Sequence, residues 1–439
     1  MIERARLFFR HVTYNLRGGF LVRPLAIALS LGCAGAALSW FEETHPSIGD
    51  WVPKVLFLSR ADPQVAQVIL GGIASSIMTV VSIVFAILLM TLTLASMQFS
   101  PRIIVSFARD RVTQWTLGIF LGTFLYCMAS LPAAHSLPHP FAPVATVAGS
   151  ILLAIVCVGL LLFFIHHISQ AISVNHIVDR IASDTERVVD EVMPAARREK
   201  HVETGDGIEA SAWEAPILNL DSGYIRFVDL KRLLLLATYH RVKLRVIRRV
   251  GQFVPAGVPL AIGDKRERLT EEVSAAVRAA FDVGPTRTLQ QDVEFGVLQI
   301  VDIALKAISP AMNDPTTAIT CVDQLSRILI RFESREMPET MLYDMQGVGR
   351  VSIRWIDSER LLDSAFEQIR MYSKSDVAVS LRLLRGYGDI ATATPSDAVR
   401  RMVFDRAKRV VDGCAERIGA EELKPLLIRL TDIQKLAFA

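Results

Sequence analysis

Long apolar runs without charged residues dominate the first part of the chain. Stretches that lack Asp, Glu, Lys and Arg cover residues 24–41, 63–101, 112–131 and 141–165. A helix needs about 20 residues to cross the roughly 30 Å hydrocarbon core of a bilayer, so these stretches are of the right order to span it. They predict four transmembrane helices, at about residues 20–41, 66–99, 113–131 and 142–168. The second stretch is longer than a bilayer needs, so its helix is expected to tilt, protrude or begin with an interfacial segment.

Composition separates an apolar part of the chain from a charged part. Hydrophobic residues make up 51% of the 439 residues, and charged residues only 21%. Up to Ile168 there are 10 Lys or Arg and 6 Asp or Glu, against totals of 48 and 45. We therefore expect a transmembrane domain over residues 1–168, surrounded by lipid, followed by a soluble region. The net charge of only +3 gives no reason to expect nucleic acid as a partner.

Basic residues that flank the spans predict the orientation of the chain, because Lys and Arg are retained on the cytoplasmic side. Five arginines precede the first span, and Arg102, Arg109 and Arg111 separate the second from the third. Residues 132–140, between the third and fourth spans, include no Lys or Arg. Both termini and the soluble region are therefore expected in the cytoplasm.

One face of the second span carries small and hydroxyl residues at alternating steps of three and four residues. These residues are Gly72, Ser75, Thr79, Ser82, Ala86, Leu89, Thr93 and Ser96. One interpretation is helix packing, because small residues let membrane helices approach closely. The other is that the hydroxyls line a hydrated path formed by several subunits. Both predict that this face is buried in protein. No span carries an ionisable residue at its centre, which argues against a proton-coupled transporter or an ion pump.

Two further patterns concern the bundle and its cytoplasmic mouth. Small residues four positions apart occur in the first span at Ala28, Gly32 and Ala36 and in the third at Gly118 and Gly122, which predicts a tight bundle and a homo-oligomer. The predicted mouth comprises Gln98, Arg102, Arg109, Asp110 and Arg111. Its three arginines either favour anions or enforce topology and bind lipid headgroups.

Beyond the spans the pattern predicts a soluble α+β region in three parts. Residues 169–215 are interpreted as a continuation of the fourth span to about Pro194, followed by a linker. Residues 216–263 combine short β-prone pieces, and the run VGQFVPAGVPL at residues 250–260 looks like part of a small barrel-sandwich module of the lipoyl or biotinyl type. It lacks the Lys that such modules modify, so a carrier role is not expected. Residues 264–439 are expected to be mainly helical.

Polar side chains gather around the helix expected at residues 292–308 and the loop that follows it. Asp314 and Pro315 are suited to the N-cap and first position of the next helix, which explains part of the motif. The other polar groups suit either a structural network or a site for a small ligand or cation. The candidates are Arg287, Gln291, Asp292, Gln299, Asp302, Asn313 and Asp314. A hydrolase would need an acid pair from these aspartates, but no His or Cys accompanies them as base or nucleophile. No catalytic residue, metal or cofactor is predicted.

Two long runs of the sequence are specific enough to compare with known families. They are SMQFSPRIIVSFARDRVTQWTLGIFLGTFLY at residues 96–126 and RTLQQDVEFGVLQIVDIALKAISPAMNDPTTA at residues 287–318. The chain resembles, over nearly its whole length, an uncharacterised bacterial membrane-protein family, the domain-of-unknown-function family 2254. The resemblance implies a multi-pass protein of the bacterial inner membrane and brings no known activity. The family's signature residues correspond here to Gln98, Ser100, Pro101, Arg102, Asp110, Arg111, Gln291, Asp292, Phe295, Gly296, Gln299, Asp302, Ser309, Pro310, Asn313, Asp314 and Pro315.

These patterns predict an α-helical multi-pass membrane protein with a C-terminal cytoplasmic α+β region. The favoured hypothesis is a homo-oligomeric channel or passive transport protein for an ion or small solute, whose cytoplasmic region assembles and gates it. The alternative is a membrane-anchored signalling or scaffold protein that binds a ligand or partner through its cytoplasmic domain.

Overall fold

The chain divides into two units, Met1–Ser173 and Val174–Ala439, and four long apolar helices form most of the described part of the first unit. The computed structural model describes residues 22–45, 62–98, 111–135, 141–171, 173–193, 213 and 215–438, and the side chains of the same residues except 94–98 and 171. The four helices are α2 (Val22–Thr44), α3 (Pro63–Gln98), α5 (Arg111–Ser130) and α6 (Val144–Ala171). Each is long and apolar enough to cross a membrane, which confirms that the sequence forms four apolar helices here.

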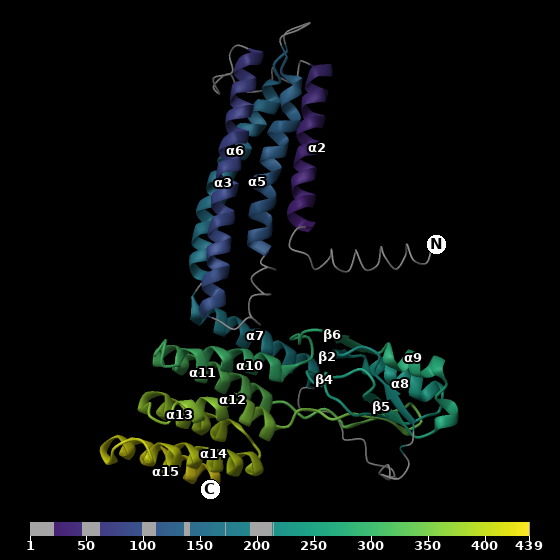
Figure 1. Ribbon diagram of the computed structural model, residues 1–439, viewed down its shortest axis with the longest axis vertical. Coiled ribbons are helices and arrows are strands. Elements are labelled where there is room, and N and C mark those ends of the chain that lie inside the picture. The colour runs from purple at the N-terminus through teal and green to yellow at the C-terminus, as the bar shows by residue number, and fades with distance from the viewer. Residues whose placement is uncertain are drawn as a thin grey trace. The chain divides into compact units, whose positions relative to one another are not determined.

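The four helices run side by side, with α5 in contact with the other three (Figure 1). Small residues set the closest approach, between α2 and α5. A Cβ atom added to Gly122 of α5 would lie only 3.0 Å from the Cβ of Leu31, and one added to Gly35 of α2 would lie 2.7 Å from the backbone oxygen of Tyr126. The small residues of α5 therefore serve helix packing, as their spacing predicts. On α2 the packed face includes Gly35, whereas Ala36 is exposed.

The fourth span does not continue as one helix to Pro194. Helix α6 ends at Ala171, and Val174–Val192 form a separate helix, α7, which belongs to the second unit. The apolar period that suggests one helix continues past α6 because α7 is amphipathic and uses its apolar residues to pack within the second unit. Helix α7 buries one side, including Val178 and Val189, against helices α10 and α11 of the second unit.

The β part of the second unit contains two sheets. The five-stranded sheet has the order β1 (Ala215–Leu218), β5 (Pro259–Gly263), β3 (Leu244–Val246), β8 (Gly349–Ser352) and β7 (Met341–Tyr343). The three-stranded sheet has the order β4 (Phe253–Val254), β2 (Gly223–Val228) and β6 (Phe281–Gly284). Neighbouring strands are antiparallel except β3 and β8, which are parallel. Helices α8 (Leu230–Tyr239) and α9 (Glu271–Arg278) lie between strands in the sequence.

This β part differs from a self-contained module of residues 216–263. Strands β6, β7 and β8 come from the range expected to be mainly helical, and Leu244 of β3 pairs with Val351 of β8. Residues 250–260 include β4 and the start of β5, but these two strands belong to different sheets and do not pair with each other. The shared core explains the arrangement, since Leu244, Val351 and Ile225 are completely buried in one apolar cluster.

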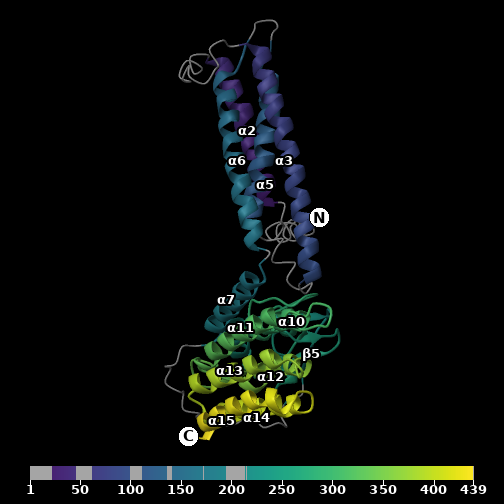
Figure 2. The same cartoon turned by 90° about the vertical axis from the view of Figure 1, so that its left-hand side faces the viewer.

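The rest of the second unit is a stack of helices, seen in Figure 2. The bounds are α10 (Val293–Ala307), α11 (Pro315–Glu333), α12 (Ser358–Tyr372), α13 (Val377–Ala393), α14 (Asp397–Ala415) and α15 (Ala420–Phe438). Helix α10 contacts α12, α11 contacts α13, and α13 contacts both α14 and α15. Five of these helices begin at a residue whose side chain accepts a hydrogen bond from a backbone N–H of the first turn. These capping residues are Asp292, Asp314, Asp357, Asp376 and Ser396.

Candidate functional site

The hydroxyl face of α3 is exposed on the surface of the four-helix unit. We use this name for Gly72, Ser75, Thr79, Ser82, Ala86 and Thr93, all of which are exposed. Leu70, Ile77 and Val84 project from the opposite side of α3 and are buried among the apolar side chains of α5 and α6. The described part of the chain therefore does not cover the hydroxyl face, and its burial in protein remains a prediction about an assembly. The side chain of Ser96 lies outside the described residues.

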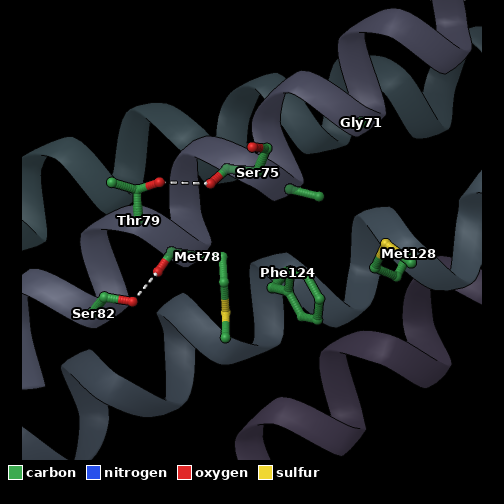
Figure 3. A pocket seen from close by; sticks show the side chains of 8 residues that line it. Gly71, Ser75, Met78, Thr79, Ser82, Phe124 and Met128 are labelled. Carbon is green, nitrogen blue, oxygen red and sulfur yellow. Dashed lines mark hydrogen bonds between the residues drawn. The ribbon is translucent and has the colours of Figure 1, made fainter.

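A shallow groove of about 540 Å³ borders the hydroxyl face, between α3 and α5 (Figure 3). Its lining comprises Gly71, Ala74, Ser75, Met78, Thr79 and Ser82 of α3, with Phe124 and Met128 of α5. One wall thus offers hydroxyl groups and the other an aromatic ring and a thioether. A polar strip beside apolar side chains suits a small solute, water or an opposing helix.

Hydrogen bonds within α3 determine which donors and acceptors of the hydroxyl face remain for other groups. The hydroxyl of Thr79 donates to the backbone oxygen of Ser75 at 3.1 Å, and that of Ser82 donates to Met78 O at 3.0 Å. Thr93 donates in the same way to Leu89 O at 2.9 Å. A hydroxyl has one donor hydrogen and two acceptor lone pairs, so these oxygens keep acceptor capacity. The face can therefore accept hydrogen bonds from water or a solute, or contribute oxygen atoms to a cation.

Most of the predicted cytoplasmic mouth lies outside the described residues. This holds for Arg102, Arg109, Asp110 and the side chain of Gln98. Arg111 is described, begins α5 and is exposed. The roles expected of the mouth arginines in attracting anions, enforcing topology or binding lipid headgroups therefore remain predictions.

In the second unit, Arg287 and Asp292 form a tight pair at the start of α10. The guanidinium donates from Nε to Asp292 Oδ2 at 2.7 Å and from Nη2 to Oδ1 at 2.9 Å. The same carboxylate caps the helix, because Oδ1 also accepts from the backbone nitrogen of Phe295 at 3.1 Å. Asp292 is only 4% exposed, and the Arg287 guanidinium lies 5.4 Å from the centre of the Phe295 ring. Two-point pairing of this kind fixes both side chains.

Glu294, in the first turn of α10, forms contacts with further arginines. Its Oε1 accepts from Arg360 Nε at 3.0 Å and from Ser364 Oγ at 3.2 Å, and its Oε2 accepts from Arg287 Nη2 at 3.3 Å. Arg249 Nη2 lies 3.6 Å from the same Oε2 atom. Glu294 is 8% exposed, so three arginines surround one buried carboxylate. We call Asp292, Glu294, Arg249, Arg287 and Arg360 the Glu294 cluster.

Burial and charge compete in this cluster. Burial acts to raise the pKa of the Glu294 carboxyl, but Arg249 and Arg360 outweigh it and hold that pKa below its ordinary value. Burial lowers the pKa of Arg249, and Glu294 offsets this only in part. Burial also acts to lower the pKa of Arg287, but its hydrogen bonds to Asp292 raise it. Glu294 and the arginines therefore remain charged at neutral pH.

The other polar candidates around α10 do not join the Glu294 cluster in one site. Gln291 is bound to strand β2, since its Oε1 accepts from Val228 N at 3.0 Å and its Nε2 donates to Val228 O at 3.3 Å. Gln299 and Asp302 are half-buried farther along α10. Gln291 thus has a structural role, joining α10 to the three-stranded sheet.

Asn313 and Asp314 lie at the far end of α10. The 15 residues of this helix place its two ends about 22 Å apart. Asp314 caps α11 by accepting from Thr317 N at 3.1 Å and Thr317 Oγ1 at 2.6 Å, with Pro315 as the first helical residue. Asn313 is exposed in the left-handed region at φ 47°. The capping predicted for Asp314 and Pro315 is confirmed, and the structure separates this loop from Arg287 and Asp292.

Sequence reasoning missed Glu294, Arg249 and Arg360. A weak signal for Glu294 is its place two residues after the capping Asp292, in the first turn of a mainly apolar helix. Arg249 precedes Gly251, where φ is +86° and an added Cβ atom would collide with Asp292 Oδ2. A glycine at this turn lets the chain pass close to the Arg287 and Asp292 pair.

Comparisons with known proteins extend over both units. The family described as "Predicted membrane protein (DUF2254)" matches residues 17–388. Uncharacterized proteins of Mycobacterium bovis and Mycobacterium tuberculosis are each 32% identical to this chain over 419 residues, which cover 93% of this chain and 78% of theirs. No solved structure matches the chain. The family match includes both the hydroxyl face of α3 and the Glu294 cluster. This chain therefore belongs to the DUF2254 family of predicted membrane proteins, whose function is unknown.

Proposed function

We propose that the protein is a homo-oligomeric channel or passive transport protein of the bacterial inner membrane, in which the hydroxyl face of α3 lines a path between subunits. The observation that carries the proposal is the exposure of Ser75, Thr79 and Ser82 on a membrane helix whose opposite side is packed. A polar surface in a membrane is favoured where it meets protein or water rather than lipid.

The chemistry of α3 supports passive movement rather than ion pumping. Residues 63–101 contain no Asp, Glu, Lys or Arg, so the helix offers no carboxylate or amine for a proton relay. The hydroxyl oxygens of Thr79 and Ser82 instead provide neutral acceptors along one side of α3. Such a surface replaces some of the hydration of a cation or a small neutral solute without holding it tightly.

The proposal includes the orientation and assembly expected from the sequence. Both termini lie in the cytoplasm, and the second unit assembles the subunits and gates the path. Arg102 and Arg109 at the cytoplasmic mouth act on topology and lipid headgroups, since basic residues there are attracted to anionic lipids.

A flux assay in proteoliposomes tests the path. Vesicles that contain the protein are expected to pass at least one of potassium, chloride and glycerol faster than empty vesicles. Replacing Ser75, Thr79 or Ser82 by Leu should reduce that flux severalfold, because an isobutyl group removes the acceptor oxygen and fills the path. Ser76→Leu is the matched control, since Ser76 is exposed on the same helix but does not line the groove.

The proposal fails if protein-containing vesicles are no more permeable than empty ones to all three solutes. It also fails if the three Leu variants assemble normally and conduct like the wild type. Mass photometry or negative-stain imaging of each variant separates loss of a path from loss of assembly.

The second candidate is a membrane-anchored protein that binds a ligand through its second unit. The observation in its favour is the Glu294 cluster, where Arg249, Arg287 and Arg360 surround a buried carboxylate. Impermeable proteoliposomes, together with a defined ligand that binds the same preparation, would favour this candidate over the channel.

A further inference from the structure

A pocket of about 250 Å³ lies beside the Glu294 cluster, within the second unit. Its lining comprises Ile247, Arg249, Gln252, Arg354, Trp355, Asp357 and Arg360. We propose that this pocket binds the phosphate group of a small soluble phosphorylated molecule. The proposal does not rest on the channel function, since binding here neither requires nor prevents permeation.

Arg249 supplies the first argument, because its charge is only partly satisfied within the protein. Its Nη2 atom is buried and has no hydrogen-bond partner among the described residues. The carboxylate oxygen Oε2 of Glu294 lies 3.6 Å away, which is close enough for attraction but too far for a hydrogen bond. A buried donor without a partner is costly, so a ligand oxygen that reaches it gains a favourable contact.

Arg360 and Arg354 place two more guanidinium groups around the same pocket. Arg360 is held by Glu294 through Nε, so its two terminal nitrogens stay available, and its side chain is 56% exposed. Arg354 is exposed on the segment between β8 and α12. Three guanidinium groups on one small pocket suit a phosphate, whose oxygens match the planar donor fork of arginine.

The one carboxylate in the lining does not cancel this charge. Asp357 is the N-cap of α12, and its Oδ1 accepts from the backbone nitrogen of Arg360 at 2.8 Å. Deeper in the protein, Arg287 is paired with Asp292. The pocket lining and the Glu294 cluster together hold four guanidinium groups against three carboxylates: Arg249, Arg287, Arg354 and Arg360 against Asp292, Glu294 and Asp357. An entering dianion meets a net positive field that partial burial strengthens.

Trp355 indicates what the phosphate is attached to. Its ring is half-buried and is fixed by a hydrogen bond from Nε1 to the backbone oxygen of Glu339 at 3.1 Å. With Ile247 it gives the pocket an apolar side next to the arginines. The volume lies below the roughly 300–1,000 Å³ of sites for drug-sized ligands. The ligand is therefore a small molecule with a phosphate and a compact apolar or planar group.

Calorimetric titration of the full-length protein in detergent tests this assignment, with inorganic phosphate and phenyl phosphate as probes. Phenyl phosphate should bind, and more tightly than inorganic phosphate because its ring reaches Trp355. Arg354→Gln should weaken phenyl phosphate binding by about tenfold or more, the effect expected for losing one charge-assisted contact. Arg401→Gln is the matched control, since it removes an exposed arginine of α14 that does not line the pocket.

Three results would overturn the proposal. The first is no heat with either probe at millimolar concentration. The second is an equal loss of binding in Arg354→Gln and Arg401→Gln, which would mean nonspecific attraction. The third is binding of short-chain phosphatidic acid but not of phenyl phosphate, which would make the ligand a lipid headgroup. Arg354 is exposed, so the folded state of its variant is preserved, and a melting curve of each variant verifies this.

Discussion

Glu42 Oε2 accepts two hydrogen bonds from Thr146, one from its backbone nitrogen and one from its hydroxyl, both at 3.0 Å. Its Oε1 accepts from the backbone nitrogen of Ala145 at 2.7 Å, and Glu42 is only 1% exposed. Ala145 and Thr146 belong to the first turn of α6, whose backbone N–H groups have no partner within the helix. A carboxylate is also favoured at the positive end of the helix dipole. The last turn of α2 therefore caps the beginning of α6.

Glu42→Ala should destabilise the four-helix unit. The change leaves buried donors of α6 without a partner, so we expect the free energy of unfolding to fall by about 1–3 kcal/mol. Thermal unfolding of the detergent-solubilised protein measures the effect. Glu43→Ala is the control, because Glu43 is about half exposed and, among the described residues, is paired with His135 at 3.4 Å. Equal melting temperatures for the two variants would contradict a capping role for Glu42.

The sequence predicts the four membrane helices well because their signal is local. A charge-free run that is long enough to cross a bilayer is typical of membrane helices. Small residues four positions apart on α5 indicate its contact with α2. The role of Glu42 is not local. An acidic residue at this position indicates only that the membrane span ends nearby. That Glu42 caps α6 depends on which helix lies beside α2 in three dimensions.

In the second unit, too, local features are predictable from the sequence whereas contacts between distant segments are not. Helix caps such as Asp314 were predictable, because an N-cap and a following proline lie next to each other in the chain. Strand β3 pairs with β8, so that Leu244 lies beside Val351, which is far from it in the sequence. A local pattern of residue types does not show which distant strands pair. Glu294 was missed for this reason, since Arg249 and Arg360 come from distant segments.

Gly122→Ala should weaken the contact between α2 and α5. The added methyl would lie 3.0 Å from the Cβ of Leu31 and would also collide with the end of that side chain, so the helices must separate. We expect a loss of about 1–3 kcal/mol in the free energy of unfolding, typical of overpacking. Gly159→Ala on α6 is the matched control, because no described residue beyond its own stretch of α6 comes within 4 Å of the added methyl.

The control is expected to change stability in the opposite direction. Alanine is favoured over glycine inside a helix by roughly 0.5–1 kcal/mol, so Gly159→Ala should leave the melting temperature unchanged or raise it. Melting curves of both variants in the same detergent test this pair. A drop of the same size in both would mean that the helices tolerate neither alanine and that the Leu31 contact is not the cause.

Glu333→Gln should stabilise the second unit at neutral pH. Burial raises the pKa of the Glu333 carboxyl, and the hydroxyls of Ser358 and Thr394 offset this only in part. The folded state therefore holds its proton to higher pH than the unfolded chain does, and stability falls as the pH rises through this window. A neutral amide removes that cost, so the melting temperature of the variant should be higher at neutral pH. Glu336→Gln, at an exposed position nearby, should change nothing, and an equal gain in both variants would contradict the burial argument.

Glu294→Gln should have the opposite effect, with the opposite dependence on pH. Burial acts to raise the pKa of Glu294, but Arg249 and Arg360 hold it below its ordinary value, so the ionised carboxylate stabilises the fold. This contribution is complete above the unfolded-state pKa of about 4.3 and is lost as the pH falls through the lower folded-state pKa. At neutral pH the variant should lose about 2–3 kcal/mol, because Arg249, Arg287 and Arg360 are left without their shared carboxylate. Melting curves of both proteins from pH 7 to pH 3 should converge toward the acidic end. A constant difference across that range would mean that Glu294 acts through its shape rather than through its charge.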